Sequence, residues 1–212
     1  MLKGLARWAP LTGVAFAVLL FVGANVGGNT PDADASPQRV VAYYTSHRGR
    51  EHASVFLIAY AIVFGLFFAA ALRSYLRSRS TESSLIALGV SGMTVLAASG
   101  AAVIGINLAA ADVPGKISPT SEQTLNVLQN DVFLGLLIGA GVFLIANGLV
   151  IVNSAALPKW LGWVALPFGV IAVTPLGWIT LIFALPLWTL IVSVLIVVRP
   201  SAQTRAPAPA TG

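Results

Sequence analysis

Cysteine is absent from the 212-residue chain, charged residues make up only 9% of it, and histidine occurs twice. Without cysteine there is no disulfide, thiolate metal site or cysteine nucleophile. His47 and His52 lie five residues apart, which is not the i, i+4 spacing of a helical zinc pair. No glycine-lysine phosphate loop, nucleophile elbow or HExxH motif occurs either. These absences favour a protein without catalytic activity.

Apolar residues dominate instead. Hydrophobic residues form 57% of the chain, and an ordinary soluble domain needs about 25% charged residues. The sequence therefore predicts an integral membrane protein of one domain. The net charge of +5 comes from basic residues that flank apolar runs, as the positive-inside rule predicts. We expect a lipid bilayer as the partner and no nucleic acid.

Apolar runs of about 20 residues are long enough to cross hydrocarbon as helices. The run 161–198 would be about 57 Å long as one helix, and its Thr174–Gly177 stretch is a turn signal that divides it. The predicted fold is all-α, a bundle of six transmembrane helices within a single domain, 1–198. The expected spans are about 8–28, 53–77, 84–111, 122–153, 159–174 and 178–198. The Pro/Ala-rich segment 199–212 predicts a disordered cytoplasmic tail.

The first apolar run has two interpretations. It could be a signal peptide that is cleaved at the small residues 33–35. However, it is longer than the usual h-region of 7–15 residues. We favour a span that is retained.

Charge predicts the orientation. Six spans place both termini on one side, and with that side cytoplasmic, eight basic residues lie inside and four outside. We therefore predict a multi-pass protein of the cytoplasmic membrane. Arg73, Arg77 and Arg79 determine topology in this interpretation, and contact with anionic lipid is the alternative.

Two outer segments carry helix-start signals. Ser36 followed by Pro37 is typical of an N-cap and first helical position, which predicts a short extracytoplasmic amphipathic helix over 37–47. The segment 120–123 resembles a capping box, so the fourth helix should begin near Ser121, before the membrane.

Asp131 is the one acidic residue of the apolar stretch 128–152. Steps of four residues join it to Gly135 and Gly139 and, further on, to Asn147. Because small residues mark faces on which membrane helices pack, we expect Asp131 and Asn147 to point into the bundle. Acids within membranes are often functional, but a wet carboxylate at the helix entrance, paired with a basic residue, is the alternative. Asn147 should make an interhelical polar contact.

Several polar residues are predicted at one depth near the outer leaflet. They are Asp131, Asn130, His52, Asn107, Asn25 and Thr174, with Tyr60 below them as a floor. Such a layer forms either a hydrogen-bonded plug or a small polar pocket. Glu51, His52 and Asp131 have the ligand types of a metal site but no spacing signature, so we expect no metal and no cofactor.

The leading hypothesis is a protein that binds or transports a small polar ligand or ion through a polar cavity near the outer leaflet. The alternative is a non-catalytic structural or accessory protein that packs against a partner, as a homo- or hetero-oligomer, through its small-residue faces.

Four stretches carry a resemblance to a known family: PDADASPQRVVAYYTSHR, FFAAALRSYLR, LQNDVFLGLLIGAGVFLIANGL and ALPKWLGWVALPFGVIAVTPLGW. Over about residues 30–198 the chain resembles a family of small multi-pass bacterial membrane proteins of unknown function. The resemblance implies a helical bundle in the cytoplasmic membrane. It implies no activity and no functional residue.

Overall fold

The structure, a computed structural model, describes residues 8–154 and 156–198. This part of the chain is helical and contains no strand, which confirms the all-α prediction. Five of its helices are long and apolar enough to cross a membrane. The predicted tail 199–212 lies outside the described residues.

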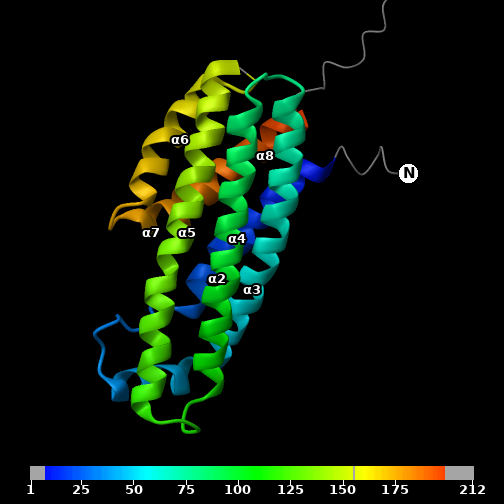
Figure 1. Cartoon of the computed structure of the whole chain (residues 1–212). Helices are drawn as coiled ribbons and strands as arrows, with labels where there is room; N and C mark the ends of the chain where they lie inside the picture. Colours follow the sequence, from blue (N-terminus) through cyan, green and yellow to red (C-terminus); the bar gives the residue numbers. More distant parts are fainter. Residues whose placement is uncertain (1–7, 155, 199–212) are drawn as a thin grey trace, which may run out of the picture.

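The elements follow one another along the chain as a sequence of long helices with short connections (Figure 1). They are η1 (Ala9–Leu11), α2 (Thr12–Gly27), α3 (Pro37–Arg77), α4 (Ser83–Asp112), α5 (Pro119–Ser154), α6 (Lys159–Ala172), α7 (Gly177–Ile179), the π-helix η2 (Thr180–Ala184) and α8 (Leu185–Val198). We call the end of the bundle with the α2–α3 and α4–α5 connections the outer end, and the opposite end the inner end.

Helix α3 begins where the sequence predicts a helix start. The Ser36 hydroxyl accepts from the Arg39 backbone N–H at 3.4 Å, and Pro37 occupies the first turn. The predicted short helix 37–47 is not a separate element, however, because α3 continues without a break for 41 residues. Val40 and Tyr44 are fully buried, so these first turns cover the outer end of the bundle.

Helix α6 is shorter than the predicted fifth span 159–174. It has 14 residues, about 21 Å at 1.5 Å per residue, whereas the hydrocarbon core is about 30 Å thick. Figure 1 shows α6 descending from the inner end only to about the middle of α5, where α7 turns the chain back. A Cβ on Gly177 would lie 2.9 Å from Leu137 of α5. Helices α6 and α8 thus form a hairpin confined to the inner half.

The turn of this hairpin leaves few free backbone donors. The N–H groups of Val173, Thr174 and Gly177 donate to carbonyls three residues earlier, at 3.3, 3.0 and 2.8 Å. The N–H of Leu176 lies 3.3 Å from the Thr174 hydroxyl oxygen, and Pro175 has no N–H. The described backbone of the turn is thus hydrogen-bonded largely within itself.

Glycine faces bring neighbouring helices into close contact. A Cβ on Gly139 of α5 would lie 2.8 Å from the Gly92 carbonyl oxygen of α4. Gly141 and Gly148 similarly approach Gly169 and Gly162 of α6, with distances of 2.9 and 3.0 Å from a built Cβ to the carbonyl oxygen. These small-residue faces are therefore used between helices of the same chain.

Aromatic side chains fill the inner half. The Phe143 ring packs edge-on against Phe68 and Trp188, with centroids 6.5 and 5.8 Å apart. The Trp188 indole N–H donates to the Leu161 carbonyl at 3.0 Å, which ties α8 to α6. The hairpin is thus an integral part of the core.

Candidate ligand-binding cavity

A cavity of about 310 Å³ lies between α2, α3, α4 and α5, towards the outer end. Its polar side is formed by Thr30, Glu51, Ser54, Asn107, Gln129 and Asn130. The apolar remainder includes Phe16, Leu20, Ile62, Leu96, Leu136 and Leu181. The cavity is therefore divided into a polar end and a larger apolar part.

The cavity exists because the α6–α8 hairpin stops halfway. In the inner half α8 packs against α2 and fills the interior with Trp188. Beyond the turn no other segment of residues 8–154 and 156–198 occupies this place, and η2 contributes Leu181 and Ile182 to the cavity wall. A π-helix at such a position is typical of functional sites.

Glu51 is the charged group of the polar end. Its side chain is 1% exposed, and both of its oxygens accept hydrogen bonds: Oε1 from the Tyr43 hydroxyl at 2.6 Å and Oε2 from Asn107 Nδ2 at 2.8 Å. A Cβ on Gly27 would lie 3.3 Å from either oxygen, so α2 also covers the carboxylate. Among the described residues Glu51 has no ion-pair partner. A buried carboxylate without a counter-ion is energetically costly.

Asn107 has an unsatisfied acceptor beside this carboxylate. The residue is 8% exposed, and its Oδ1 is buried without a hydrogen-bond partner. Because Nδ2 must face the acceptor-only carboxylate, Oδ1 is left for another donor. Ser54, one turn along from Glu51, donates instead to the Gly23 carbonyl at 2.8 Å.

The α2–α3 connection, 28–36, closes the outer end of the cavity. Asn126 Nδ2 and Asn130 Nδ2 both donate to the Pro31 carbonyl, at 3.1 and 3.4 Å. Gly28 begins the connection with φ +99°, a conformation that favours glycine. The backbone of this segment is thus held against α5.

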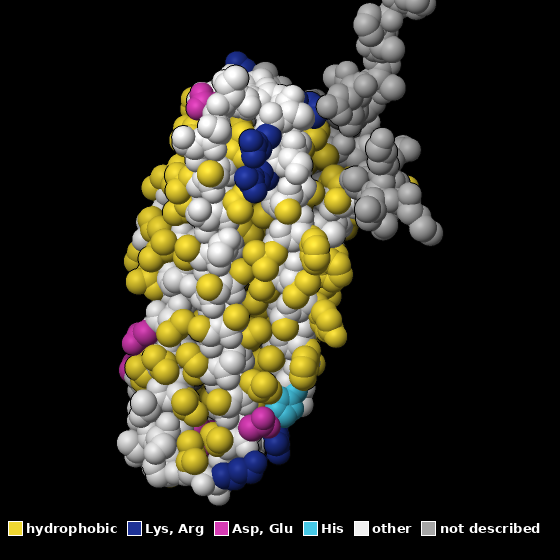
Figure 2. All heavy atoms as spheres, turned by 45° about the vertical axis from the view of Figure 1, so that its right-hand side comes forward, with side chains coloured by type: hydrophobic (Ala, Val, Ile, Leu, Met, Phe, Trp, Pro, Cys, Tyr) yellow, Lys and Arg dark blue, Asp and Glu magenta, His cyan; other side chains and the backbone are white. Residues whose placement is uncertain are grey.

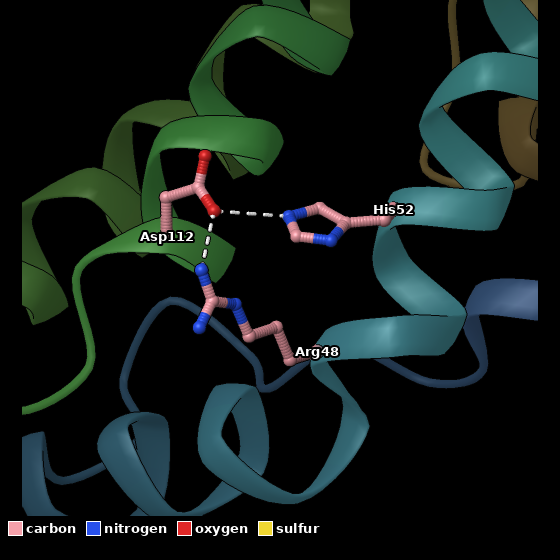
Figure 3. A network of polar contacts seen from close by, with 3 residues as sticks. All are labelled: Arg48, His52 and Asp112. Atoms are coloured by element: carbon pink, nitrogen blue, oxygen red, sulfur yellow. Dashed lines mark hydrogen bonds and ion pairs between the residues drawn. The ribbon is translucent and has the colours of Figure 1, made fainter.

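Arg48, His52 and Asp112 form a second polar cluster nearer the surface (Figure 3). Asp112 Oδ1 lies 2.9 Å from Arg48 Nη2 and 3.1 Å from His52 Nε2. The three side chains are between 31% and 52% exposed, and such surface pairs contribute little to stability. The cluster joins α3 to the end of α4. Nowhere in the described chain are three His, Cys, Asp or Glu residues grouped as metal ligands would be.

The structure brings only part of the predicted polar layer together. The buried Asn107 and the exposed Asn130 line the cavity, whereas Asn25 and Tyr60 are exposed outside it and His52 faces Asp112. Thr174 lies in the hairpin turn, where its hydroxyl donates to the Ile171 carbonyl at 2.7 Å.

Asp131 is exposed on the surface of α5 and does not point into the bundle. The reason lies in the helical period. Each step of four residues exceeds a full turn by about 40°, so Asp131 is rotated by about 160° from Asn147, four steps away. The stripe that contains the buried Gly139 and Asn147 therefore leaves the interior before it reaches Asp131.

Asn147 is buried where α5 packs against α4, opposite a glycine and not opposite a polar side chain. It is 3% exposed, and a Cβ on Gly89 of α4 would lie 2.6 Å from its Nδ2. Its hydrogen bond is made within α5, however, to the Phe143 carbonyl at 2.8 Å.

Sequence reasoning missed Glu51 as the central residue of the site. A signal was present, because backward steps of three or four residues from Ala61 lead to Ile58, Ser54 and Glu51 on one face of α3. Glu122 and Asn126 of α5 are further buried polar residues near the outer end, both with 0% exposure. They could have been found by the same helical spacing, since Glu122, Asn126 and Asn130 follow one another at intervals of four residues along α5.

The chain matches no protein-family model, no curated protein and no solved structure. Its function must therefore be inferred from the cavity itself.

Proposed function

We propose that this protein binds a small ligand carrying a cationic or hydrogen-bond-donating group in the outer-end cavity, as a binding or transport protein of the membrane. The observation that carries this proposal is the buried carboxylate of Glu51, which has no ion-pair partner within 4 Å in the described chain and lies beside the unpartnered Asn107 Oδ1.

The polar end of the cavity favours a ligand that donates hydrogen bonds. A carboxylate and an amide oxygen only accept hydrogen bonds, and a cation bound beside them would offset the cost of burying Glu51. The hydrogen bonds from Tyr43 and Asn107 hold the carboxylate in place before any ligand arrives. Glu51 is thus the acidic residue of the binding site, in place of Asp131, the acid of the predicted polar layer.

We further infer a placement in the cytoplasmic membrane with both termini on the cytoplasmic side. Figure 2 shows a broad belt of hydrophobic side chains, with basic side chains gathered towards the two ends. In this placement the five candidate spans, from Ala9–Gly27 to Gly177–Val198, cross the membrane, the shorter α6 leads into the last of them, and the turns 37–47 lie at the outer surface. Reporter fusions within 29–36 and 113–118 should report the outer side, and cytoplasmic signals there would overturn this threading.

Exposed arginines support contact with anionic lipid at the inner end. Arg73 and Arg77 are exposed on α3, while the Arg79 guanidinium stacks 4.0 Å from the centroid of the Tyr75 ring. Unfolding in nanodiscs of anionic lipid should occur at a higher temperature than in zwitterionic nanodiscs, and R73Q/R77Q should remove the difference. An unchanged difference would exclude these two residues.

The accessory-protein alternative has less support. The small-residue faces that would receive a partner pack instead against helices of the same chain, as at Gly92 and Gly139.

Binding can be tested with simple amines. Ethylammonium and n-hexylammonium chloride are added to the purified full chain, and the thermal unfolding midpoint is compared with that in sodium chloride of equal ionic strength. We expect a rise in midpoint that increases with amine concentration, because ligands that bind the folded state stabilise it.

Two variants make the test specific. Glu51→Gln should abolish the rise, whereas Glu82→Gln, at the start of α4 at the inner end, should retain it. Equal responses of Glu51→Gln and wild type would overturn the proposal, as would the absence of a response to either amine in the wild type. If Glu51→Gln does not fold, the cavity-narrowing Ala24→Phe variant replaces it.

A further inference from the structure

We infer that the ligand is an amphiphile with a protonated amine head and a short apolar tail, and that it enters the cavity sideways from the bilayer between α2 and α5. This inference rests on the proposed function and adds the class of ligand and its route.

The outer end of the cavity is partly covered by a network of hydrogen bonds. The Tyr43 hydroxyl lies 3.2 Å from the Gly27 carbonyl oxygen, and Arg50 Nε donates to the Val26 carbonyl at 2.9 Å. These contacts pin the end of α2 to α3. The bonds from Asn126 and Asn130 to Pro31 pin the connection that follows to α5. A water-soluble ligand entering from outside would have to break this cover.

The side of the cavity between α2 and α5 has less direct helix packing. Helix α2 packs on α3 and α8, and α5 packs on α4 and α6. Within the described chain, no comparable packing joins α2 directly to α5. Ala24 of α2, Phe133 of α5 and Ile182 of η2 line the cavity here, and all three are partly exposed. These three residues are apolar, as a passage from lipid requires, and the exposed polar Asn130 lies one turn from Phe133 towards the outer end.

The cavity has separate regions for the polar head and the apolar tail of the ligand. Glu51 and Asn107 are at the polar end, and Phe16, Leu96 and Leu136 belong to the apolar part. The volume of about 310 Å³ is at the lower end of the range for ligand pockets, which limits the tail to a few carbons. The ligand would thus have the polarity of a lipid and a much smaller size.

A primary ammonium group fits the head position. It offers three N–H donors and no acceptor. The acceptors that it would meet are the Glu51 carboxylate, already oriented by two hydrogen bonds, and the unpartnered Asn107 Oδ1. Charge-assisted hydrogen bonds of this kind are about twice as strong as neutral ones.

The experiment compares three probes on the full chain in nanodiscs: n-hexylammonium, ethylammonium and n-hexanol. Dissociation constants are obtained by calorimetric titration at known free probe concentration. We expect hexylammonium to bind at least tenfold more tightly than ethylammonium, which lacks most of the tail, and at least tenfold more tightly than hexanol, which lacks the charge. Ala24→Phe should weaken hexylammonium binding at least tenfold, whereas the matched Ala102→Phe, exposed on α4 away from the cavity, should leave it unchanged.

The outcomes separate this inference from the proposed function. If ethylammonium binds as tightly as hexylammonium and the binding still requires Glu51, the tail and the lateral route are refuted while cation binding at the cavity stands. If hexanol equals hexylammonium, the amine head is refuted. If no amine binds, both proposals fail. Equal binding by Ala24→Phe and Ala102→Phe would refute the α2–α5 opening alone.

Discussion

The inner and outer halves of the bundle are built from the same four long helices but differ in what occupies the space between them. In the inner half the α6–α8 hairpin supplies Trp188, which packs on Phe143 at 5.8 Å between centroids. In the outer half the same space is a cavity of about 310 Å³ with a buried carboxylate on its wall.

The difference shows that a site can arise from the shortness of one element. None of the helices α2 to α5 has to bend apart to create the cavity, since the hairpin ends at α7. The close glycine contacts between α4 and α5 hold these two helices together beside the cavity. The two halves should therefore respond differently to the same kind of substitution.

The largest contrast is expected between two phenylalanines of α5. Phe143→Ala in the filled half should lower the free energy of unfolding by about 3–5 kcal/mol, because it leaves a new cavity in a packed core. Phe133→Ala, on the wall of the existing cavity, should cost about 1–2 kcal/mol because less contact is lost. Reversible unfolding in mixed micelles measures both, and equal losses would contradict the contrast.

A smaller change in the free energy of unfolding is expected at the glycines where α4 and α5 pack together. A Cβ on Gly139 would approach the backbone of Leu96 and Gly92, so Gly139→Ala should cost about 2 kcal/mol through overpacking. Gly105 of α4 has no atom within 4 Å of a built Cβ. Gly105→Ala should therefore gain up to about 1 kcal/mol from helix propensity. A loss at Gly105 equal to that at Gly139 would show that the backbone contact is not the cause.

At the polar end of the cavity, Glu51→Leu and Glu51→Gln should differ in how much they lower the free energy of unfolding. Glu51→Leu leaves the Tyr43 hydroxyl and Asn107 Nδ2 without an acceptor, which should cost about 2 kcal/mol. Glu51→Gln keeps an acceptor oxygen and should cost less than about 1 kcal/mol while removing the response to amines. The unfolding midpoints of the two variants, measured side by side without amine, test this order. A Leu variant as stable as wild type would mean that the hydrogen bonds contribute nothing.

The smallest effect is expected at Asp131. Its side chain is exposed and has no ion-pair or hydrogen-bond partner in the part of the chain that the structure describes. Asp131→Asn and Asp131→Leu should both unfold at the wild-type temperature and retain amine binding. A loss of amine binding in either variant would show that Asp131 contributes to the binding site.

The sequence was sufficient for the helices and several of their contacts. Apolar runs placed the helices of the bundle, Ser36 and Pro37 predicted the start of α3, and Gly135 and Gly139 predicted a contact face on α5. These features depend on local composition and spacing, which one sequence displays directly.

The cavity could not be predicted in the same way. It depends on α6 ending near the middle of α5, and hydropathy does not show where along a neighbouring helix a short apolar helix ends. The error at Asp131 has a different origin, because a four-residue stripe was extended over 16 residues, further than the 3.6-residue period permits. The same period, applied backwards from Ala61, leads to Glu51.

The hairpin also has a consequence for how such a protein could change over time. Both of its ends lie at the end of the bundle where the chain starts, since η1 packs against α8. Lengthening or shortening α6 and η2–α8 together would therefore alter the direction of no other helix. Each added turn would remove about 5.4 Å from the depth of the cavity. Natural variation could thus resize the binding site in steps of one helical turn while the rest of the protein stays as it is.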